Sequence, residues 1–571
     1  MMNSKEIKNK VYTAITIGPI GKTLAKARSV KSFWTASYLF SWIMRKLLEK
    51  LPKENFEILS PYRAGKDVLG EISKKVGLFP DRLFAKGELK EGEEDEDGLK
   101  KIKEKIFGGL AREFISTFQR EEKDIEQKIA KESDPKRKRE LEEIKSRYSN
   151  AALKGEEYIS EYLENYLSIS CITVELNSDC NILEQLNKYL DTQELFNKAS
   201  SHTDEDYMEL FIEAPNNPFL KAYSQERAFP STSEIAVSGW EQNPPKDENG
   251  EVEYSELKSS KEGFRNCYKY LAVIKADGDG FGKYIKKLKV DEEKEIKENG
   301  EKENELTRFT KSFFEFSVEV ADELIRKTKA RPVYIGGDDL FLFTPVLEGD
   351  TEKDVFNLIE KIDTSFRGFQ EKLNADFPDI AKKPDTKLSM SYGVSIFYYK
   401  SPMSEAIHIA DSMLRKAKEE KEEKEKEKKK DAVAISIQKH SGQKIEFLLP
   451  CKHSTDKCKQ ETGLYKKATE LIRAFKEDDS MLNSLIYWIE DMYETIFTDE
   501  VTLYQERINA VFDNFFDEEI HKENEVFFDL LKGFILSMHH SKDAPCELSD
   551  KKKLLHGILR YCQFVTAKKE K

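Results

Sequence analysis

The tetrapeptide Gly-Gly-Asp-Asp at 336–339 places two carboxylates side by side between two apolar runs. The runs 331–335 and 340–344 are rich in β-formers, and glycine supplies the positive φ that a tight turn needs. The segment therefore predicts a β-hairpin with both acids at its tip. Adjacent carboxylates repel each other, so such a pair is costly unless a cation lies between them.

A second acidic cluster lies upstream, where the strand-like run 271–276 is followed by Asp-Gly-Asp-Gly-Phe-Gly-Lys at 277–283. Asp277 ends the strand, and the glycines would let a phosphate approach the backbone. If the two strands are neighbours, Asp277 and Asp338 meet at one edge of a sheet. Carboxylates that bridge two Mg²⁺ ions are suited to in-line attack on a nucleotide phosphate. Either motif alone could be a plain polar turn, whereas the combination favours a catalytic metal site.

Two α/β domains are expected to position these residues. The first begins with a strand at 11–17, continues with a helix at 23–50 and has a strand at 56–59, but it has no Gly-Gly-Asp-Asp of its own. The second carries the acidic motifs. Its further expected elements are helices at 304–328, 352–373 and 404–418 and strands at 390–396, 432–437 and 445–449.

The segments outside these two α/β domains are predicted to be mainly helical. We expect residues 1–98 with parts of 168–213 to form a first, degenerate α/β domain, 99–167 a helical hairpin or insertion, 180–263 an irregular and helical linker subdomain, 264–450 the second α/β domain with the Gly-Gly-Asp-Asp hairpin, and 451–571 a C-terminal α-helical domain. Pro-Ser-Thr at 230–232 predicts a capped helix start.

Composition limits the function classes. The formal net charge of −13 argues against a surface coated by nucleic acid, so RNA contacts would need a local patch such as the basic residues 1–50. No apolar run suits a membrane span and no signal peptide is evident, so we expect a cytoplasmic protein with no membrane partner. Cys451, His453 and Cys458 could hold a metal, but the spacing is loose and no fourth ligand is evident, so zinc is not expected.

Several motifs together resemble one family. Asp277-Gly278-Asp279, the hairpin and the helix 410–418 ending in Ala-Lys are similar to the palm domain of GGDEF diguanylate cyclases and nucleotide polymerases. The segments 15–20, 27–41 and 229–236 narrow the choice, because they resemble the large subunit of type III-B (Cmr) CRISPR effector complexes, the Cas-ten family.

This resemblance implies an α+β fold of two ferredoxin-like palm domains plus helical domains. The second palm would transfer AMP from ATP, with Asp277, Asp338 and Asp339 catalytic. The expected metal ligands, for two Mg²⁺ or Mn²⁺ ions, are Asp277, Gly278, Asp338 and Asp339. The expected ATP contacts are Gly278, Asp279, Gly280, Phe281, Gly282, Gly336, Gly337, Ser391 and Lys418. The implied partners are the other Cmr subunits, a CRISPR guide RNA and a target RNA that switches synthesis on.

Two departures from the family bear on the product. The chain starts at the first palm strand and has no His-Asp dipeptide, so no HD nuclease is expected, and the family's four-cysteine zinc site is missing. Most active members make cyclic oligoadenylates, whereas some members without an HD domain adenylylate S-adenosylmethionine. The acceptor pocket should lie between the palms, with Asp67 a candidate by position.

Two hypotheses from other classes stay open. A stand-alone GGDEF-type cyclase acting on GTP would explain the acidic motifs, but it would explain neither the first palm nor the helical tail. The second hypothesis is a non-catalytic scaffold, and the intact acidic residues of the two motifs argue against it.

Overall fold

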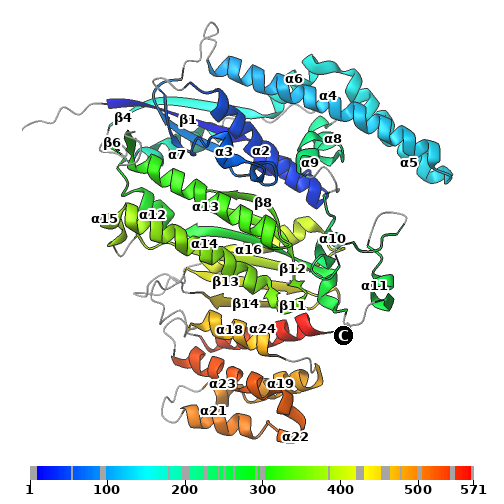
Figure 1. The fold of residues 1–571 in the computed structure, drawn as a ribbon, viewed down its shortest axis with the longest axis vertical. Coiled ribbons are helices and arrows are strands. Elements are labelled where there is room, and N and C mark those ends of the chain that lie inside the picture. The colour runs from blue at the N-terminus through cyan, green and yellow to red at the C-terminus, as the bar shows by residue number, and fades with distance from the viewer. Residues whose placement is uncertain are drawn as a thin grey trace, which may run out of the picture.

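The computed structural model describes residues 9–52, 56–89, 98–177, 181–195, 206–223, 229–241, 243–247, 252–260, 264–289, 293–295, 302–383, 386–418, 430–451, 463–475, 479–497, 504–540 and 547–567. These residues form an elongated stack (Figure 1). Helices α4–α6 lie at one end, followed by a four-stranded sheet, a six-stranded sheet and a C-terminal group of helices at the other end.

The six-stranded sheet has the order β14-β13-β12-β5-β9-β8. All neighbours are antiparallel except β12 and β13. The four strands β12-β5-β9-β8 reproduce the order of a ferredoxin-like βαββαβ unit. The bounds are β5 (Tyr270–Asp279), β8 (Arg331–Gly336), β9 (Asp339–Pro345), β12 (Ser389–Tyr398), β13 (Ala432–Gln438) and β14 (Lys444–Pro450).

The four-stranded sheet repeats that topology, with the antiparallel order β2-β3-β1-β4. The bounds are β1 (Asn9–Gly18), β2 (Glu57–Ser60), β3 (Arg82–Lys86) and β4 (Ser168–Asn177). The predicted fold of two ferredoxin-like palm sheets with added helices is confirmed. Two two-stranded ribbons, β6 (Glu293–Glu295) with β7 (Lys302–Asn304) and β10 (Leu347–Glu348) with β11 (Asp350–Asp354), complete the described strands.

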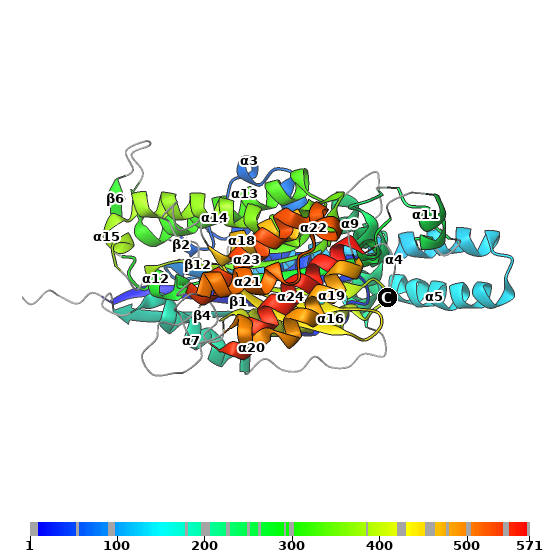
Figure 2. The same ribbon diagram turned by 90° about the horizontal axis from the view of Figure 1, so that it is seen from below.

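Helices cover the two faces of the second sheet. In Figures 1 and 2, α13 (Glu305–Lys327) and α14 (Val355–Asp376) lie on one face and α16 (Met403–Lys418) on the other. The apolar stripe of α13, including Phe309, Val320 and Leu324, is buried, as its 3.6-residue period predicts. The short helices α12 (Phe281–Ile285) and α15 (Pro378–Ala381) connect these layers.

The helix predicted at 23–50 is two helices, α1 (Ile20–Leu24) and α2 (Val30–Lys50). The prediction of one helix was wrong because Ser29 adopts an extended backbone and caps a new start, its side chain accepting from the backbone N–H of Ser32. The predicted start after Pro230 is confirmed, since Ser231 and Glu234 form a capping box on α10 (Thr232–Val237).

The remaining helices surround the two sheets. Between β2 and β3 lie α3 (Lys66–Leu69) and η1 (Ile72–Lys74), and between β3 and β4 lie α4 (Leu99–Lys131), α5 (Pro135–Leu153) and α6 (Gly155–Tyr166). Further on are α7 (Ile182–Leu195), α8 (Tyr207–Glu213), α9 (Pro218–Tyr223), α11 (Tyr254–Ser260) and η2 (Asn266–Lys269). The C-terminal helices are α18 (Leu464–Ala474), α19 (Asp479–Asp491), α20 (Tyr493–Ile496), α21 (Tyr504–Asp513), α22 (Glu518–His521), η4 (Lys522–Asn524), α23 (Glu525–His540) and α24 (Leu548–Thr566).

The two sheets are joined by hydrogen bonds and by aromatic packing. Gly77, from the connection between β2 and β3, forms a parallel bridge with β8: its N–H donates to the Val333 carbonyl (3.2 Å), and its carbonyl accepts from the Ile335 N–H (2.8 Å). Phe33 of α2 packs edge-on against Phe341 of β9, with centroids 5.2 Å apart. The two palms therefore share one hydrophobic core.

No helix in the described part of the chain is both long enough and apolar enough to span a bilayer.

Candidate active site at the junction of the two palms

The Gly-Gly-Asp-Asp segment is the tip of the hairpin formed by β8 and β9, as predicted. Gly336 is paired with Asp339, so Gly337 and Asp338 form a two-residue turn. Gly337 has φ +67°, which an L-residue adopts only with strain, and this explains the glycine there. The turn directs Asp338 and Asp339 toward the neighbouring strand β5.

The register between β5 and β9 brings the acidic motifs together. Asp277 is directly opposite Asp339, and the Gly278 N–H donates to the Asp338 carbonyl oxygen at 2.9 Å. The predicted meeting of the two strands is thus correct, although the direct partner of Asp277 is Asp339 and Asp338 lies one residue beyond. Directly opposed like charges on neighbouring strands are destabilising, so the arrangement needs a source of positive charge.

Burial and mutual repulsion perturb these acids. The pKa of Asp338 is above its ordinary value, first because of burial and then because of the Asp277 carboxylate. The pKa of Asp339 is raised to about 7 by burial against the surrounding protein and by the charges of Asp338 and Asp277, which Lys418 and Lys275 only partly offset. Asp339 nevertheless keeps part of its surface exposed, so the carboxylate is accessible to a ligand.

Lys418, the last residue of α16, is a nearby cation. Its Nζ lies 2.5 Å from Asp277 Oδ1 and 3.8 Å from Asp279 Oδ1, and it donates to the Gly278 carbonyl at 3.2 Å. The position at the helix end follows from the apolar stripe of α16, which buries Ala410, Met413 and Ala417 on the sheet. Lys418 therefore extends along the edge where the three carboxylates meet.

Asp279 and Ser391 form a buried support behind this edge. Asp279 is 3% exposed, and its Oδ2 accepts from the Ser391 hydroxyl (2.6 Å), the Ser389 hydroxyl (3.0 Å) and the Asp431 N–H (3.2 Å). Its other oxygen, Oδ1, is buried and has no hydrogen-bond partner. Ser391 is fully buried, so its contact with a nucleotide, and that of Asp279, stay predictions from the motif.

The glycines of the first motif have a packing role. A Cβ at Gly278 would lie 2.3 Å from the Phe281 ring and 2.8 Å from the Asp338 Cβ, so only glycine fits between the hairpin and α12. Phe281 is buried and stacks on Phe313 of α13, with centroids 4.8 Å apart. Gly280 and Gly282 lie at the start of α12. The predicted approach of a phosphate to this loop stays a prediction, and for Phe281 it rests on the motif alone.

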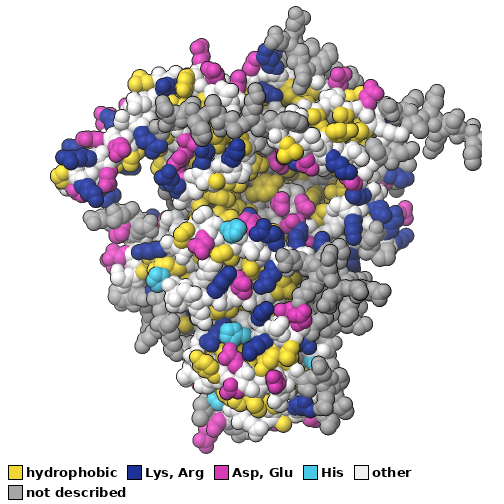
Figure 3. Space-filling view, turned by 180° about the vertical axis from the view of Figure 1, so that it is seen from behind, with side chains coloured by type: hydrophobic (Ala, Val, Ile, Leu, Met, Phe, Trp, Pro, Cys, Tyr) yellow, Lys and Arg dark blue, Asp and Glu magenta, His cyan; other side chains and the backbone are white. Residues whose placement is uncertain are grey.

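A cavity of about 370 Å³ lies between the two palms beside Asp339. Figure 3 shows a hollow between the upper and middle parts of the molecule, with hydrophobic side chains inside it and acidic side chains at its edge. The first palm lines the cavity with Ile20, Leu24, Phe33, Ser37, Phe40, Ser41, Phe79 and Asp81, and the second palm with Lys275, Ala276, Tyr334, Asp339, Leu340, Phe341, Asp411 and Leu414. A second, more open hollow of about 480 Å³ is lined by Asp277, His408, Asp411, Leu414, Arg415 and Lys418. The two share Asp411 and Leu414, so they flank the same edge.

The charges around the cavity do not balance. Lys275 Nζ lies 2.5 Å from Asp411 Oδ1. In the described part of the chain, no basic side chain forms an ion pair with Asp81 or Asp339. Burial raises the pKa of Asp81. A backbone hydrogen bond and the Arg82 charge partly offset that rise, and the Glu194 charge adds to it.

Sequence reasoning missed the carboxylate that the first palm contributes to the cavity. Asp81 stands just before β3 in Pro-Asp-Arg, which has no motif of its own, and only the fold brings it to the cavity. The proposed Asp67 lies in α3, and its side chain is outside the described part of the structure. Lys275, Tyr334 and Asp411 were not predicted to line this cavity either: Lys275 and Tyr334 lie beside the acidic motifs, and Asp411 lies in the helix motif but was given no role.

The carboxylates of the acidic edge are the candidate ligands for the expected metal ions. Among the described residues, no group of three or more His, Cys, Asp or Glu side chains is arranged so that it could hold a metal ion without rearrangement. The crowded carboxylates Asp277, Asp338 and Asp339 and the buried Asp279 oxygen that accepts no hydrogen bond nevertheless suit hard divalent cations, which prefer carboxylate oxygens. Of the possible zinc residues, Cys451 is buried with its pKa raised well above its usual value by burial, while His453 and Cys458 lie outside the described residues.

Comparison with known families matches this geometry. The second palm domain of Cas10/Cmr2 matches residues 270–434, and the N-terminal domain of the CRISPR-associated protein Cmr2 matches residues 12–150. The matches cover more than half of the chain and include most strands of both sheets and the acidic edge, which defines a protein of two palm domains. The chain belongs to the Cas10/Cmr2 family.

Solved structures agree on the fold. A chain in the apo structure of the type III-B Cmr-β complex has 12% sequence identity and a TM-score of 0.57, over 98% of this chain and 82% of that chain. A chain of the same complex bound to cognate target RNA has 13% identity and a TM-score of 0.55, over 98% and 83%. No curated protein matches the sequence.

Proposed function

We propose that the chain transfers AMP from ATP to a hydroxyl or an equivalent acceptor, releasing pyrophosphate and producing a signalling nucleotide. The observation that carries the proposal is the carboxylate edge: Asp277 opposite Asp339, Asp338 one residue beyond, and Lys418 at 2.5 Å from Asp277. A purely structural edge would pair these charges, because opposed like charges cost stability without a compensating ligand.

Each residue has a role that follows from its position. Asp277, Asp338 and Asp339, with the Gly278 carbonyl beside them, would hold two Mg²⁺ or Mn²⁺ ions. Bound there, the metal would offset phosphate charge and favour an ionised attacking hydroxyl. Asp339 can also accept the proton of that hydroxyl. Lys418 would leave Asp277 and bind the triphosphate oxygens.

The first candidate product is a cyclic oligoadenylate, formed when the 3′-hydroxyl of one ATP attacks the α-phosphate of another. This follows the expectation for active members of the family. Synthesis would take place in a Cmr-type complex with sister subunits and guide RNA, and target RNA would switch it on. The similarity to chains of the Cmr-β complex, one of them bound to target RNA, supports this setting.

The second candidate differs only in the acceptor, S-adenosylmethionine, which would give an AMP conjugate. The charge of the cavity favours it. Asp81 and Asp339 face a largely apolar cavity whose lysine lies against Asp411. An acceptor that carries sulfonium and ammonium charges would balance those carboxylates. The triphosphate of an ATP acceptor is negatively charged, so it would have to lie away from these two carboxylates.

Product analysis separates the candidates. The assembled complex would be given ATP, Mg²⁺ and target RNA, with and without S-adenosylmethionine, and its products identified by mass spectrometry. Cyclic adenylates from ATP alone support the first candidate, and an AMP conjugate that needs S-adenosylmethionine supports the second. No product in either condition would favour the scaffold hypothesis.

A further inference from the structure

One wall of the cavity is α1, a helix of only five residues (Ile20–Leu24). Ile20 and Leu24 line the cavity, whereas Thr23 is fully buried away from solvent. A single turn of helix has no stability of its own in water, because helix nucleation is unfavourable. The position of this wall must therefore be set by contacts to other elements.

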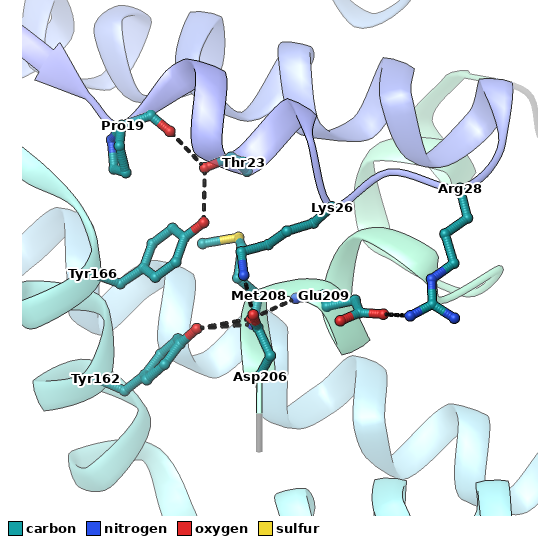
Figure 4. Close-up of polar contacts among 9 residues, drawn as sticks. All are labelled: Pro19, Thr23, Lys26, Arg28, Tyr162, Tyr166, Asp206, Met208 and Glu209. Atoms are coloured by element: carbon teal, nitrogen blue, oxygen red, sulfur yellow. Dashed lines mark hydrogen bonds and ion pairs between the residues drawn. The ribbon is translucent and has the colours of Figure 1, made fainter. Parts of the chain in front are cut away.

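Two polar contacts hold α1 from behind (Figure 4). The Thr23 hydroxyl donates to the Pro19 carbonyl at 2.8 Å and lies 3.0 Å from the Tyr166 hydroxyl. Because Thr23 uses its only proton on Pro19, Tyr166 must be the donor to Thr23. Lys26, two residues after α1, forms an ion pair with Asp206, and its ammonium lies 5.8 Å from the Tyr166 ring centroid.

Both anchoring partners belong to elements outside the first sheet. Tyr166 ends α6, the last helix of the α4–α6 insertion, and Asp206 is the N-cap of α8, accepting from the Glu209 N–H at 3.0 Å. Tyr162 of α6 donates to the same Asp206 carboxylate at 3.3 Å and accepts from the Met208 N–H at 3.1 Å. The insertion and α8 are thus fixed to each other and to the wall of the cavity.

We propose that Tyr166 and Asp206 are positioning residues for the acceptor. They hold α1 so that Ile20 and Leu24 shape the acceptor side of the cavity, and through them the helical insertion sets acceptor affinity. This inference rests on the proposed function only in taking the cavity as the acceptor site. The proposed ATP contacts all lie in the second palm and do not include α1, so the contacts should affect the acceptor and leave the donor site intact.

The test compares Tyr166→Phe, Thr23→Val and their combination in the full-length chain within its complex. Backbone hydrogen exchange over residues 19–28 reports on α1 directly and needs no activity. Tyr166→Phe should speed exchange of the Thr23 and Ala25 amides about fivefold, the effect of losing one hydrogen bond. Thr23→Val should speed it at least as much, because it also removes the hydrogen bond to the Pro19 carbonyl. The double variant should do no more than Thr23→Val alone, because Thr23→Val already removes the contact with Tyr166.

Steady-state kinetics provides the second readout. The KM of the acceptor, measured with S-adenosylmethionine at saturating ATP or with ATP alone, should rise about fivefold while kcat stays within about twofold. Arg28→Gln is the matched control, because Arg28 lies in the same connection but its side chain is 77% exposed and pairs with Glu209 at the surface. It should leave both readouts unchanged.

Unchanged exchange in α1 would overturn the proposal, and so would faster exchange with an unchanged acceptor KM. Failure of the unmodified complex to transfer AMP at all would overturn the proposed function instead. The exchange measurement would then still decide whether Tyr166 holds α1.

Discussion

The two palm sheets have the same strand order, and they differ most clearly where their central strand pairs end. In the first sheet the last pair between β1 and β3 is Thr16 with Arg82, and in the second sheet the last pair between β5 and β9 is Asp277 with Asp339. The same place in one topology is thus occupied by a hydroxyl and a cation in one copy and by two carboxylates in the other.

The surroundings make the contrast sharper. Arg82 is neutralised by Asp191 at 2.7 Å and Glu194 at 3.0 Å, both on α7, and the Thr16 hydroxyl donates to Glu194 at 2.9 Å. The first edge is a closed ion-pair network. The second edge has three carboxylates crowded together, with Lys418 as the cation nearest to Asp277. The charges of the first edge are thus balanced within the chain, whereas the second edge fits the proposed binding of a ligand that brings positive charge.

The largest expected effect comes from removing the carboxylates of the second edge. Asp338→Ala combined with Asp339→Ala should lower AMP transfer at least about a thousandfold, because both proposed metal ligands from the hairpin are lost. Pyrophosphate release by the assembled complex with target RNA and Mg²⁺ is the measurement.

The matched control is the edge of the first palm. Asp191→Asn combined with Glu194→Gln removes both ion-pair partners of Arg82 and should change thermal stability but not the rate. If the hairpin variant kept full ATP turnover, or if the control variant lost it to the same degree, the contrast between the palms would be refuted.

A smaller loss is expected at the end of α16. Lys418→Ala should lower kcat/KM for ATP about a hundredfold, since the proposed contact with the triphosphate disappears. Lys416→Ala is the matched control two residues earlier: Lys416 pairs with Glu446 at 3.7 Å near the surface, and its loss should have little effect. Equal losses in the two variants would mean that helix charge in general, rather than Lys418, supports ATP binding.

Much of the second palm could be predicted from sequence because its signals are local. The hairpin, the strand ending at Asp277 and the helix ending at Lys418 each have their pattern within about twenty residues. The exact register is not local, which is why Asp338 rather than Asp339 was expected to meet Asp277. The buried state of Ser391 was also hidden, because it depends on Asp279 and on the backbone of Asp431, far apart in the chain.

The contribution of the first palm could not be predicted in the same way. Asp81 reaches the cavity only because β3 pairs with β1 and because Gly77 bridges to β8, two contacts across long sequence separations. The prediction of a single helix at 23–50 was wrong for a local reason, because Ser29 was not recognised as an N-cap residue. That error concealed α1, and with it the wall of the cavity.

A moderate effect should show whether the first palm contributes chemistry as well as shape. If S-adenosylmethionine is the acceptor, Asp81→Asn should lower its kcat/KM about tenfold, because one carboxylate facing a cationic ligand is lost. Turnover of ATP without S-adenosylmethionine should not fall. Asp67→Asn is the comparison, because sequence reasoning assigned it the same role. A fall in kcat/KM for Asp67→Asn but not for Asp81→Asn would indicate that Asp67 in α3, rather than Asp81, interacts with the acceptor.

The smallest effect concerns pH and tests whether the second edge is electrostatically strained without ligand. The pKa of Asp339 is about 7, above its ordinary value of 3.8, so the folded chain holds a proton that the unfolded chain releases. Stability from this group is therefore full below pH 4 and is lost as pH rises through 7. Asp339→Asn should then raise the melting temperature by about a degree at pH 8 without divalent cations, and not at pH 4.

Mg²⁺ should stabilise the unmodified chain more at pH 8 than at pH 6, and this difference between the two pH values should shrink in the Asp339→Asn variant. A uniform shift at every pH would mean that Asp339 is not strained, and that the two edges differ in composition but not in electrostatic cost.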